Sequence, residues 1–211
     1  MNKNIILLLI SLMFSSFPVL ADVESSTRPD QMLEARTNEV LTELSKNGGA
    51  LRNDLEGLYQ MVDRLIMPMV DFTAMSKLIL GKHWKKASPE QREAFIKAFS
   101  GMLKNTYTKS LRQYANQSIR YLPAKTRITG KYATVYSEFV PGNGKPNVPV
   151  IYKLRQSKDG TWKAYNLELE GLSVVKNFRT DFNREISATS LDALIARLEK
   201  QKDQAAKTAT N

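Results

Sequence analysis

The chain has 211 residues, with no cysteine, one histidine, and 31 lysine and arginine residues against 21 aspartate and glutamate residues. Without cysteine no disulfide can form, and one histidine alone cannot build a zinc site of the usual kind. The formal net charge of +10 predicts attraction to anionic surfaces, such as nucleic acid, anionic lipid head groups or an acidic protein.

The N-terminus has the pattern of a Sec-type secretory signal peptide. Lys3 precedes an apolar run over residues 5–14, and Val19 and Ala21 are small residues at the positions before a cut. We expect cleavage after Ala21 and export of the remaining chain, which argues against nucleic acid as a partner. A membrane anchor is the alternative, but serines and a proline interrupt the run, and nothing later approaches the roughly 18 apolar residues of a spanning helix. No cysteine stands at the cleavage site, which excludes lipoprotein anchoring.

The exported part is long enough for one compact domain. We expect residues 22–202 to form this domain and residues 203–211 to be a polar tail. A first helix is expected to begin at Pro29 and to end before a pair of glycines. A second helix is expected over residues 51–68. It should end at Pro68, because the residue before a proline disfavours the helical conformation.

Two further helices carry clear start signals. Asp71 can cap a short helix that closes at Gly81. Ser88, with Pro89 in the first turn and Gln91 at the third position, has the pattern of a capping box and opens the longest helix. The apolar stripe of that helix consists of Phe95, Phe99, Met102, Leu103, Tyr107, Leu111 and Tyr114.

The second half of the chain has the alternation of β-strands. Turn-forming segments separate the strands, so we expect an antiparallel sheet with one face buried beneath the helices. The expected strands are residues 118–122, 132–140, 148–155 and 161–170. A helix from Gly171 to about Ile186 and a last helix from Ser190 to near Lys202 are expected to follow.

Residues 160–182 join the last strand to the next helix. Strict alternation places Lys163, Tyr165, Leu167 and Leu169 on one face of the strand, and Trp162, Ala164, Asn166 and Glu168 on the other. At Gly171 the period changes, and Leu172, Val175, Phe178 and Phe182 recur at helical spacing. A sheet face and a helix face that meet at a glycine can enclose an apolar chamber, although a solid core would have the same pattern.

No catalytic constellation stands out in the sequence. His83 is expected to be structural, and the glycine-containing segment near residue 143 lies between strands and not before a helix, so it predicts a hairpin and not a phosphate loop. Acidic residues leave one alternative open, because a single carboxylate inside an apolar pocket could serve an isomerase. The residues considered for that role are Asp63, Asp71, Glu138, Glu168 and Glu170.

Two segments resemble the MlaC family of periplasmic phospholipid-binding proteins, once called toluene-tolerance proteins. The first spans residues 78–99, with a Leu-Gly before Trp84, the Ser-Pro-x-Gln-Arg helix start and two spaced phenylalanines. The second has the pattern Gly-x-Trp, an aromatic residue and Glu-Gly-x-Ser over residues 160–173, with Asn166 where the family usually has aspartate. The resemblance covers nearly all of the exported chain.

The resemblance implies an α+β fold of the nuclear-transport-factor-2-like type, with a four-stranded antiparallel sheet packed against helices, a helical extension and an apolar pocket. It implies a soluble periplasmic carrier that is not an enzyme, needs no cofactor and holds a phospholipid as cargo. Its partners would be an outer-membrane lipoprotein and porin complex and an inner-membrane ABC transporter with an MCE-domain ring. Such a carrier would maintain outer-membrane lipid asymmetry, and a monomer is the simplest form for a shuttle.

We therefore predict lipid contacts from the sheet face and from the facing helices. The predicted lipid-binding residues are Leu65, Met69, Phe72, Met75, Phe99, Leu103, Tyr107, Val150, Tyr152, Leu154, Tyr165, Leu167, Leu172, Val175 and Phe178. No catalytic residue and no metal ligand is predicted. Two alternatives remain, an envelope adaptor with a solid core and an isomerase-like enzyme with a buried carboxylate.

Overall fold

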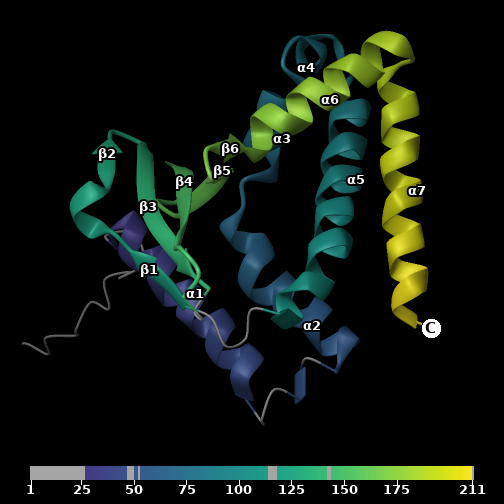
Figure 1. Cartoon of the computed structure of the whole chain (residues 1–211). Helices are drawn as coiled ribbons and strands as arrows, with labels where there is room; N and C mark the ends of the chain where they lie inside the picture. The colour runs from purple at the N-terminus through teal and green to yellow at the C-terminus, as the bar shows by residue number, and fades with distance from the viewer. Residues whose placement is uncertain (1–26, 47–49, 52, 114–117, 142–143, 211) are drawn as a thin grey trace, which may run out of the picture.

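A computed structural model describes residues 27–46, 50–51, 53–113, 118–141 and 144–210. The predicted signal peptide therefore lies outside the described residues. Figure 1 shows an α+β arrangement in which the sheet lies at one side and α5, α6 and α7 lie at the other. The α-helices are α1 (Pro29–Ser45), α2 (Leu55–Met61), α3 (Phe72–Leu80), α4 (Lys82–Lys86), α5 (Pro89–Thr108), α6 (Val174–Ala188) and α7 (Leu191–Thr210).

The predicted helix starts at Asp71 and Ser88 are confirmed. The Asp71 carboxylate accepts a hydrogen bond of 2.8 Å from the backbone N–H of Ala74 and so caps α3. Ser88 and Gln91 form the complete capping box of α5, each side chain accepting from the other residue's backbone N–H. These local bonds fix where α3 and α5 begin.

The single helix expected over residues 51–68 is wrong. Asp54 caps α2 through the N–H of Gly57, so the helix begins only at Leu55. After α2 the chain continues as a π-helical turn, η3 (Val62–Ile66), and a 3₁₀ turn, η4 (Met67–Met69), with Pro68 inside it. A π turn accommodates an extra residue in the helix, and proline cannot donate the regular backbone bond, so the hydrophobic pattern alone could not show this break.

All described strand pairings within the sheet are antiparallel, as predicted, but the sheet has six strands and not four. Its order is β1-β3-β4-β5-β6, and β2 pairs with β3. The two additional strands are three and two residues long and carry no apolar alternation, so the sequence pattern missed them. The strands are β1 (Ser118–Tyr121), β2 (Arg127–Thr129), β3 (Tyr132–Val140), β4 (Val148–Gln156), β5 (Trp162–Leu169) and β6 (Leu172–Ser173).

A β-bulge in β5 overturns the strict alternation predicted for this strand. Lys153 pairs with Asn166 and Leu154 pairs with Ala164, so Tyr165 is an extra residue between the two pairs. Ala164 consequently lies on the same face as Leu167, because residues directly opposite one another share a face. Tyr165 instead stacks edge-on against the exposed Tyr132 on the other face of the sheet, with ring centroids 6.3 Å apart.

A tight turn separates β5 from β6. Glu170 and Gly171 both have positive φ angles, of 50° and 79°, as a hairpin connection with this twist requires. Leu172 therefore lies in β6, where it pairs with Leu169 of β5, and it is 63% exposed. Its predicted place on the helix face is wrong. The helix α6 begins at Val174, capped by the hydroxyl of Ser173.

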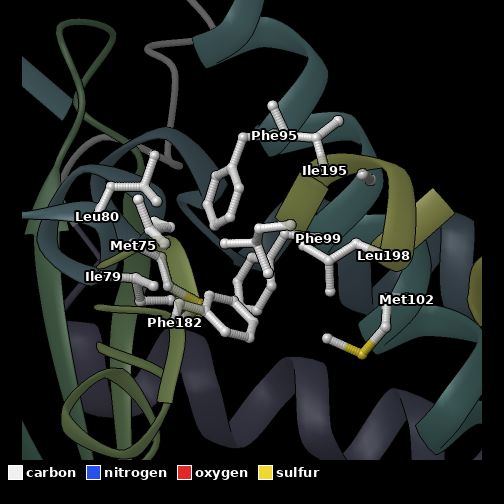
Figure 2. Packing of buried hydrophobic residues seen from close by; sticks show 12 residues of the cluster. Met75, Ile79, Leu80, Phe95, Phe99, Met102, Phe182, Ile195 and Leu198 are labelled. Atoms are coloured by element: carbon white, nitrogen blue, oxygen red, sulfur yellow. The ribbon is translucent and has the colours of Figure 1, made fainter. Parts of the chain in front are cut away.

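An aromatic cluster fills the space between α3, α5, α6 and α7. Phe99 is completely buried and contacts Phe95, Phe178 and Phe182, with ring centroids 5.1 to 6.0 Å apart. Figure 2 shows the rings of Phe95, Phe99 and Phe182 gathered in this cluster. A second cluster joins α1 to α2 and η3, and a third joins α1 to the sheet. The core is therefore divided into a helical part and a part beneath the sheet.

The last helix is longer than expected, since α7 continues to Thr210 through most of the predicted polar tail. It packs alongside α5 (Figure 1). Within the described ranges, no helix has both the length and the apolar character needed to cross a membrane.

Candidate functional site

An apolar cavity of about 410 Å³ lies between the sheet, the η3–η4 segment and the C-terminal half of α5. This volume falls within the range of roughly 300–1,000 Å³ that is typical of small-molecule sites. The lining residues are Leu33, Val62, Ile66, Met67, Met69, Val70, Phe72, Met75, Leu103, Lys104, Tyr107, Thr108, Leu111, Tyr152, Ala164, Asn166, Leu167, Leu169 and Val174.

The sheet wall is set by the pairing of β4 with β5. Tyr152 is directly opposite Leu167, and the bulge brings Ala164 onto their face. A backbone bond then ties the start of α3 to this wall, because the N–H of Asp71 donates to the carbonyl of Ala164 over 2.8 Å. The small side chain of Ala164 leaves room where the helical segment crosses the strand.

The helical wall follows one stripe of α5 and one edge of η3. Leu103 and Tyr107 of α5 are four residues apart, and Leu111 follows at the same spacing in a 3₁₀ turn, η5 (Lys109–Gln113). Val62 and Ile66 of η3 have the same spacing. Three methionines complete this wall, namely Met67, Met69 and Met75. Methionine is unbranched and flexible, so this side of the cavity can adapt to ligands of different shape.

Polar groups of α5 also line the cavity. The ammonium of Lys104 donates to both carboxylate oxygens of Asp63, at 3.0 and 3.1 Å, and lies 5.6 Å from the ring centre of Tyr59. Tyr107 is 56% exposed, so the cavity meets solvent beside this residue. Thr108 is buried and donates to the backbone carbonyl of Lys104 over 2.6 Å.

The sheet side of the cavity carries neutral polar groups. Burial raises the pKa of the Tyr152 phenol, although its bonds with Tyr121 and Ser137 oppose this effect, so the phenol is uncharged near neutral pH. The amide oxygen of Asn166 accepts from the hydroxyl of Ser173 and from the N–H of Val175, each at 3.1 Å. Both side chains serve the fold here, and neither brings a charge to the cavity.

None of the described residues that line the cavity is a carboxylate. Asp71 caps α3 and forms an ion pair with Arg155, while Glu138 pairs with Arg120. His83 bonds to Asn183 of α6, 2.9 Å away. The arrangement therefore gives no support to an isomerase that uses a carboxylate in this cavity.

Seven of the fifteen predicted lipid-binding residues line the cavity, and their role in binding stays a prediction. They are Met69, Phe72, Met75, Leu103, Tyr107, Tyr152 and Leu167. The sequence therefore identified both walls, although only part of each one.

The other eight predicted residues lie elsewhere. Phe99 belongs to the helical core, where its ring lies 5.1 Å from that of Phe178, and Val175 and Phe178 pack against the same cluster. Val150 and Leu154 are buried beneath the sheet outside the cavity lining, and Leu65 is buried beside α1 and α2. As described above, the bulge and the tight turn place Tyr165 and Leu172 away from the cavity.

Several lining residues were missed by the sequence reasoning. The predicted apolar stripe includes Leu111 together with Leu103 and Tyr107, but the predicted lipid-binding set does not include it. Val62 and Ile66 also carry a helical signal, but the same signal is typical of core residues. Ala164 could not have been found, because no residue pattern marks the bulge.

The family described as MlaC protein matches residues 34–200. The intermembrane phospholipid transport system binding protein MlaC of Haemophilus influenzae is 22% identical over 197 residues, covering 93% of this chain and 92% of that protein. Toluene tolerance protein ttg2D of Pseudomonas putida is 33% identical over 171 residues, covering 81% of this chain and 77% of that protein.

A solved structure has a similar fold. It is the phospholipid-binding protein from Ralstonia solanacearum in complex with a phospholipid, with a TM-score of 0.75 and 25% sequence identity. The similarity covers 85% of this chain and 99% of that one.

Proposed function

Because the chain belongs to the MlaC family, we propose that it is a periplasmic carrier that holds a phospholipid by its acyl chains. The observation that carries the proposal is the apolar cavity between β4, β5, η3–η4 and α5. The phospholipid bound in the similar structure from Ralstonia solanacearum supports it. We further propose a nuclear-transport-factor-2-like arrangement with a helical extension for this chain.

The physical task of such a carrier is to keep hydrocarbon out of water. Two acyl chains of about 15 methylenes each, at about 0.8 kcal/mol per methylene, represent on the order of 24 kcal/mol of exposed hydrocarbon. A cavity lined by Leu167, Leu103 and Met75 offers an environment similar to the bilayer interior. Transfer of the lipid between two similar environments needs no chemical step and no cofactor.

The head group of the lipid is proposed to stay at the solvent end of the cavity. Lys104 and Tyr107 lie there, and an ammonium and a phenol can both donate to a phosphate oxygen. Lys104 would exchange part of its bond with Asp63 for the phosphate. An acyl chain would then extend toward the apolar wall formed by β4 and β5.

The proposed route runs across the periplasm. After removal of residues 1–21, a monomer of the domain would exchange lipid with an outer-membrane lipoprotein and porin complex and with an inner-membrane ABC transporter that bears an MCE-domain ring. This exchange would maintain the lipid asymmetry of the outer membrane. The excess of basic residues supports a docking step on acidic surfaces.

A vesicle experiment tests the carrier function. Donor vesicles that contain a labelled phospholipid are separated from acceptor vesicles by a membrane that only protein can pass. We expect the label to reach the acceptor in proportion to the protein added. No transfer, together with no lipid on the protein recovered from the donor side, would favour the adaptor without a lipid cavity.

A further inference from the structure

A second cavity lies on the other side of the η3–η4 segment. It has a volume of about 280 Å³ and is enclosed by α1, by η3–η4 and by the start of β5. We call it the α1 chamber, and its lining residues are Thr27, Met32, Ala35, Arg36, Arg64, Leu65, Pro68, Met69, Thr161 and Trp162. Leu65, one of the predicted lipid-binding residues, lines this chamber and not the main cavity.

Met69 lines both cavities, so its side chain forms part of the partition between them. Along the rest of η3–η4 the residues divide between the two sides. Val62, Ile66 and Met67 line the main cavity, whereas Leu65 and Pro68 line the α1 chamber. The partition along this segment is thus an irregular stretch of chain, and Met69 is the residue that both cavities share.

This partition can move more easily than a regular helix. It consists of a π turn followed by a 3₁₀ turn with a proline, so it lacks the continuous backbone bonding of an α-helix. None of the three residues of η4 is fully buried. Met69 has three side-chain torsions and can change rotamer without a change in the backbone.

The chemistry of the α1 chamber suits a hydrocarbon chain better than a free anion. Met32, Leu65 and Trp162 give it an apolar floor. The two arginines at its rim already have acidic partners, because Arg36 bonds to Glu39 at 3.2 Å and Arg64 bonds to Glu43. The rim charges are therefore compensated, and the chamber has no excess charge to attract a phosphate.

We propose that the α1 chamber receives the second acyl chain of the bound phospholipid, with Met69 as the partition that moves to admit it. The inference rests on the proposed carrier function. The main cavity, at about 410 Å³, lies in the lower part of the range for drug-sized ligands, and a phospholipid with two acyl chains is larger than such ligands. The adjoining chamber adds about 280 Å³ to this space.

Two substitutions on the two sides of the partition test this assignment. Met32→Trp adds bulk to the α1 chamber from α1, whereas Met67→Trp adds the same bulk to the main cavity from η4. Each secreted protein is incubated with a diacyl phosphatidylethanolamine or with its single-chain lyso form, recovered, and measured by native mass spectrometry. Both the bound lipid and its amount per protein are read directly.

Met32→Trp is expected to lower retention of the diacyl lipid at least about tenfold and to leave retention of the lyso form unchanged, because only one chain loses its site. Met67→Trp is expected to lower retention of both lipids. Equal retention of the diacyl lipid by Met32→Trp and the unaltered protein would overturn the proposal. If the unaltered protein retains neither lipid, the carrier function itself fails, which is a different result.

A third variant guards against the possibility that Met32→Trp does not fold. Met69→Ala removes the side chain between the two cavities and is expected to shift the bound diacyl lipids toward longer chains. The comparison uses an equimolar mixture of two diacyl lipids, one with chains of about 14 carbons and one with chains of about 18 carbons. An unchanged ratio of the two bound lipids would contradict the joined chambers.

Discussion

Leu167 occupies a decisive position, because it lies in the middle of the sheet wall of the cavity. It pairs with Tyr152 and faces the helical wall, whereas its neighbour Glu168 pairs with Ile151 on the opposite face. An arginine at position 167 would bring an unpaired charge into apolar surroundings. We predict that Leu167→Arg abolishes co-purification of lipid with the secreted protein, measured by extraction and mass spectrometry.

Glu168→Arg on the same strand is the matched control for this variant. It introduces the same side chain on the face of the sheet that does not line the cavity, so a normal amount of lipid is expected. A full lipid complement on Leu167→Arg would show that this strand face does not contact the cargo.

Asp30 connects the start of α1 to the acid stability of the protein. Its carboxylate is 2% exposed and accepts two bonds of 3.1 Å from the guanidinium of Arg28. Burial alone would raise the pKa of Asp30, but the bonds from Arg28 and from the backbone outweigh burial and lower it. The folded state therefore favours the ionised carboxylate more than the unfolded chain does.

The consequence for stability has a definite sign. The contribution of Asp30 is fully present above about pH 4, its ordinary pKa, and is lost as the pH falls through the lower folded-state pKa. Asp30→Asn should therefore give a shallower fall in the free energy of unfolding below about pH 4, measured by urea titration at several pH values. If the free energy of unfolding falls equally steeply with pH in the two proteins, Asp30 does not contribute to the acid stability.

At the scale of elements, the aromatic cluster holds α5 against α6. Phe99 is fully buried there and does not line the cavity. We predict that Phe99→Ala lowers the free energy of unfolding by about 3–5 kcal/mol, as for other buried phenylalanines. The protein that remains folded should carry as much lipid as the unaltered protein, which extraction of the folded fraction measures. A selective loss of lipid without loss of stability would mean that Phe99 does contact the cargo.

The elements also show how far the sequence can predict this structure. Local signals were sufficient for the starts of α3 and α5, because Asp71 and Ser88 bond to backbone groups only three residues away. They were insufficient for the bulge at Tyr165, since its extra residue is defined by pairing with another strand. That single irregularity reversed the faces assigned to Ala164 and Tyr165.

The candidate site was harder to predict than the fold. Leu103 and Phe99 lie on the same apolar stripe of α5, yet one lines the cavity and the other is packed among rings. Both environments select large apolar side chains, so composition and spacing cannot separate them. The difference arises only in the folded structure, where Phe99 packs against the rings of Phe95, Phe178 and Phe182.

At the scale of the whole molecule, the excess of basic over acidic residues should strengthen the encounter with anionic membranes. Exposed charges are screened over about 10 Å at 0.1 M salt, so their attraction for an anionic surface weakens as salt rises. We predict that uptake of lipid from vesicles rich in phosphatidylglycerol slows as sodium chloride is added, measured by a fluorescent lipid. Uptake from zwitterionic vesicles serves as the control and should change little. Equal salt dependence for both vesicles would exclude charge steering.

The most direct test of the carrier function is native mass spectrometry of the protein secreted after expression of all 211 residues, with identification of the molecules that dissociate from it. We predict a monomer that begins at Asp22 and carries one phospholipid, with both chains protected inside the protein. A protein that is reproducibly empty, and remains empty after incubation with phospholipid vesicles, would contradict the carrier function and favour an adaptor role.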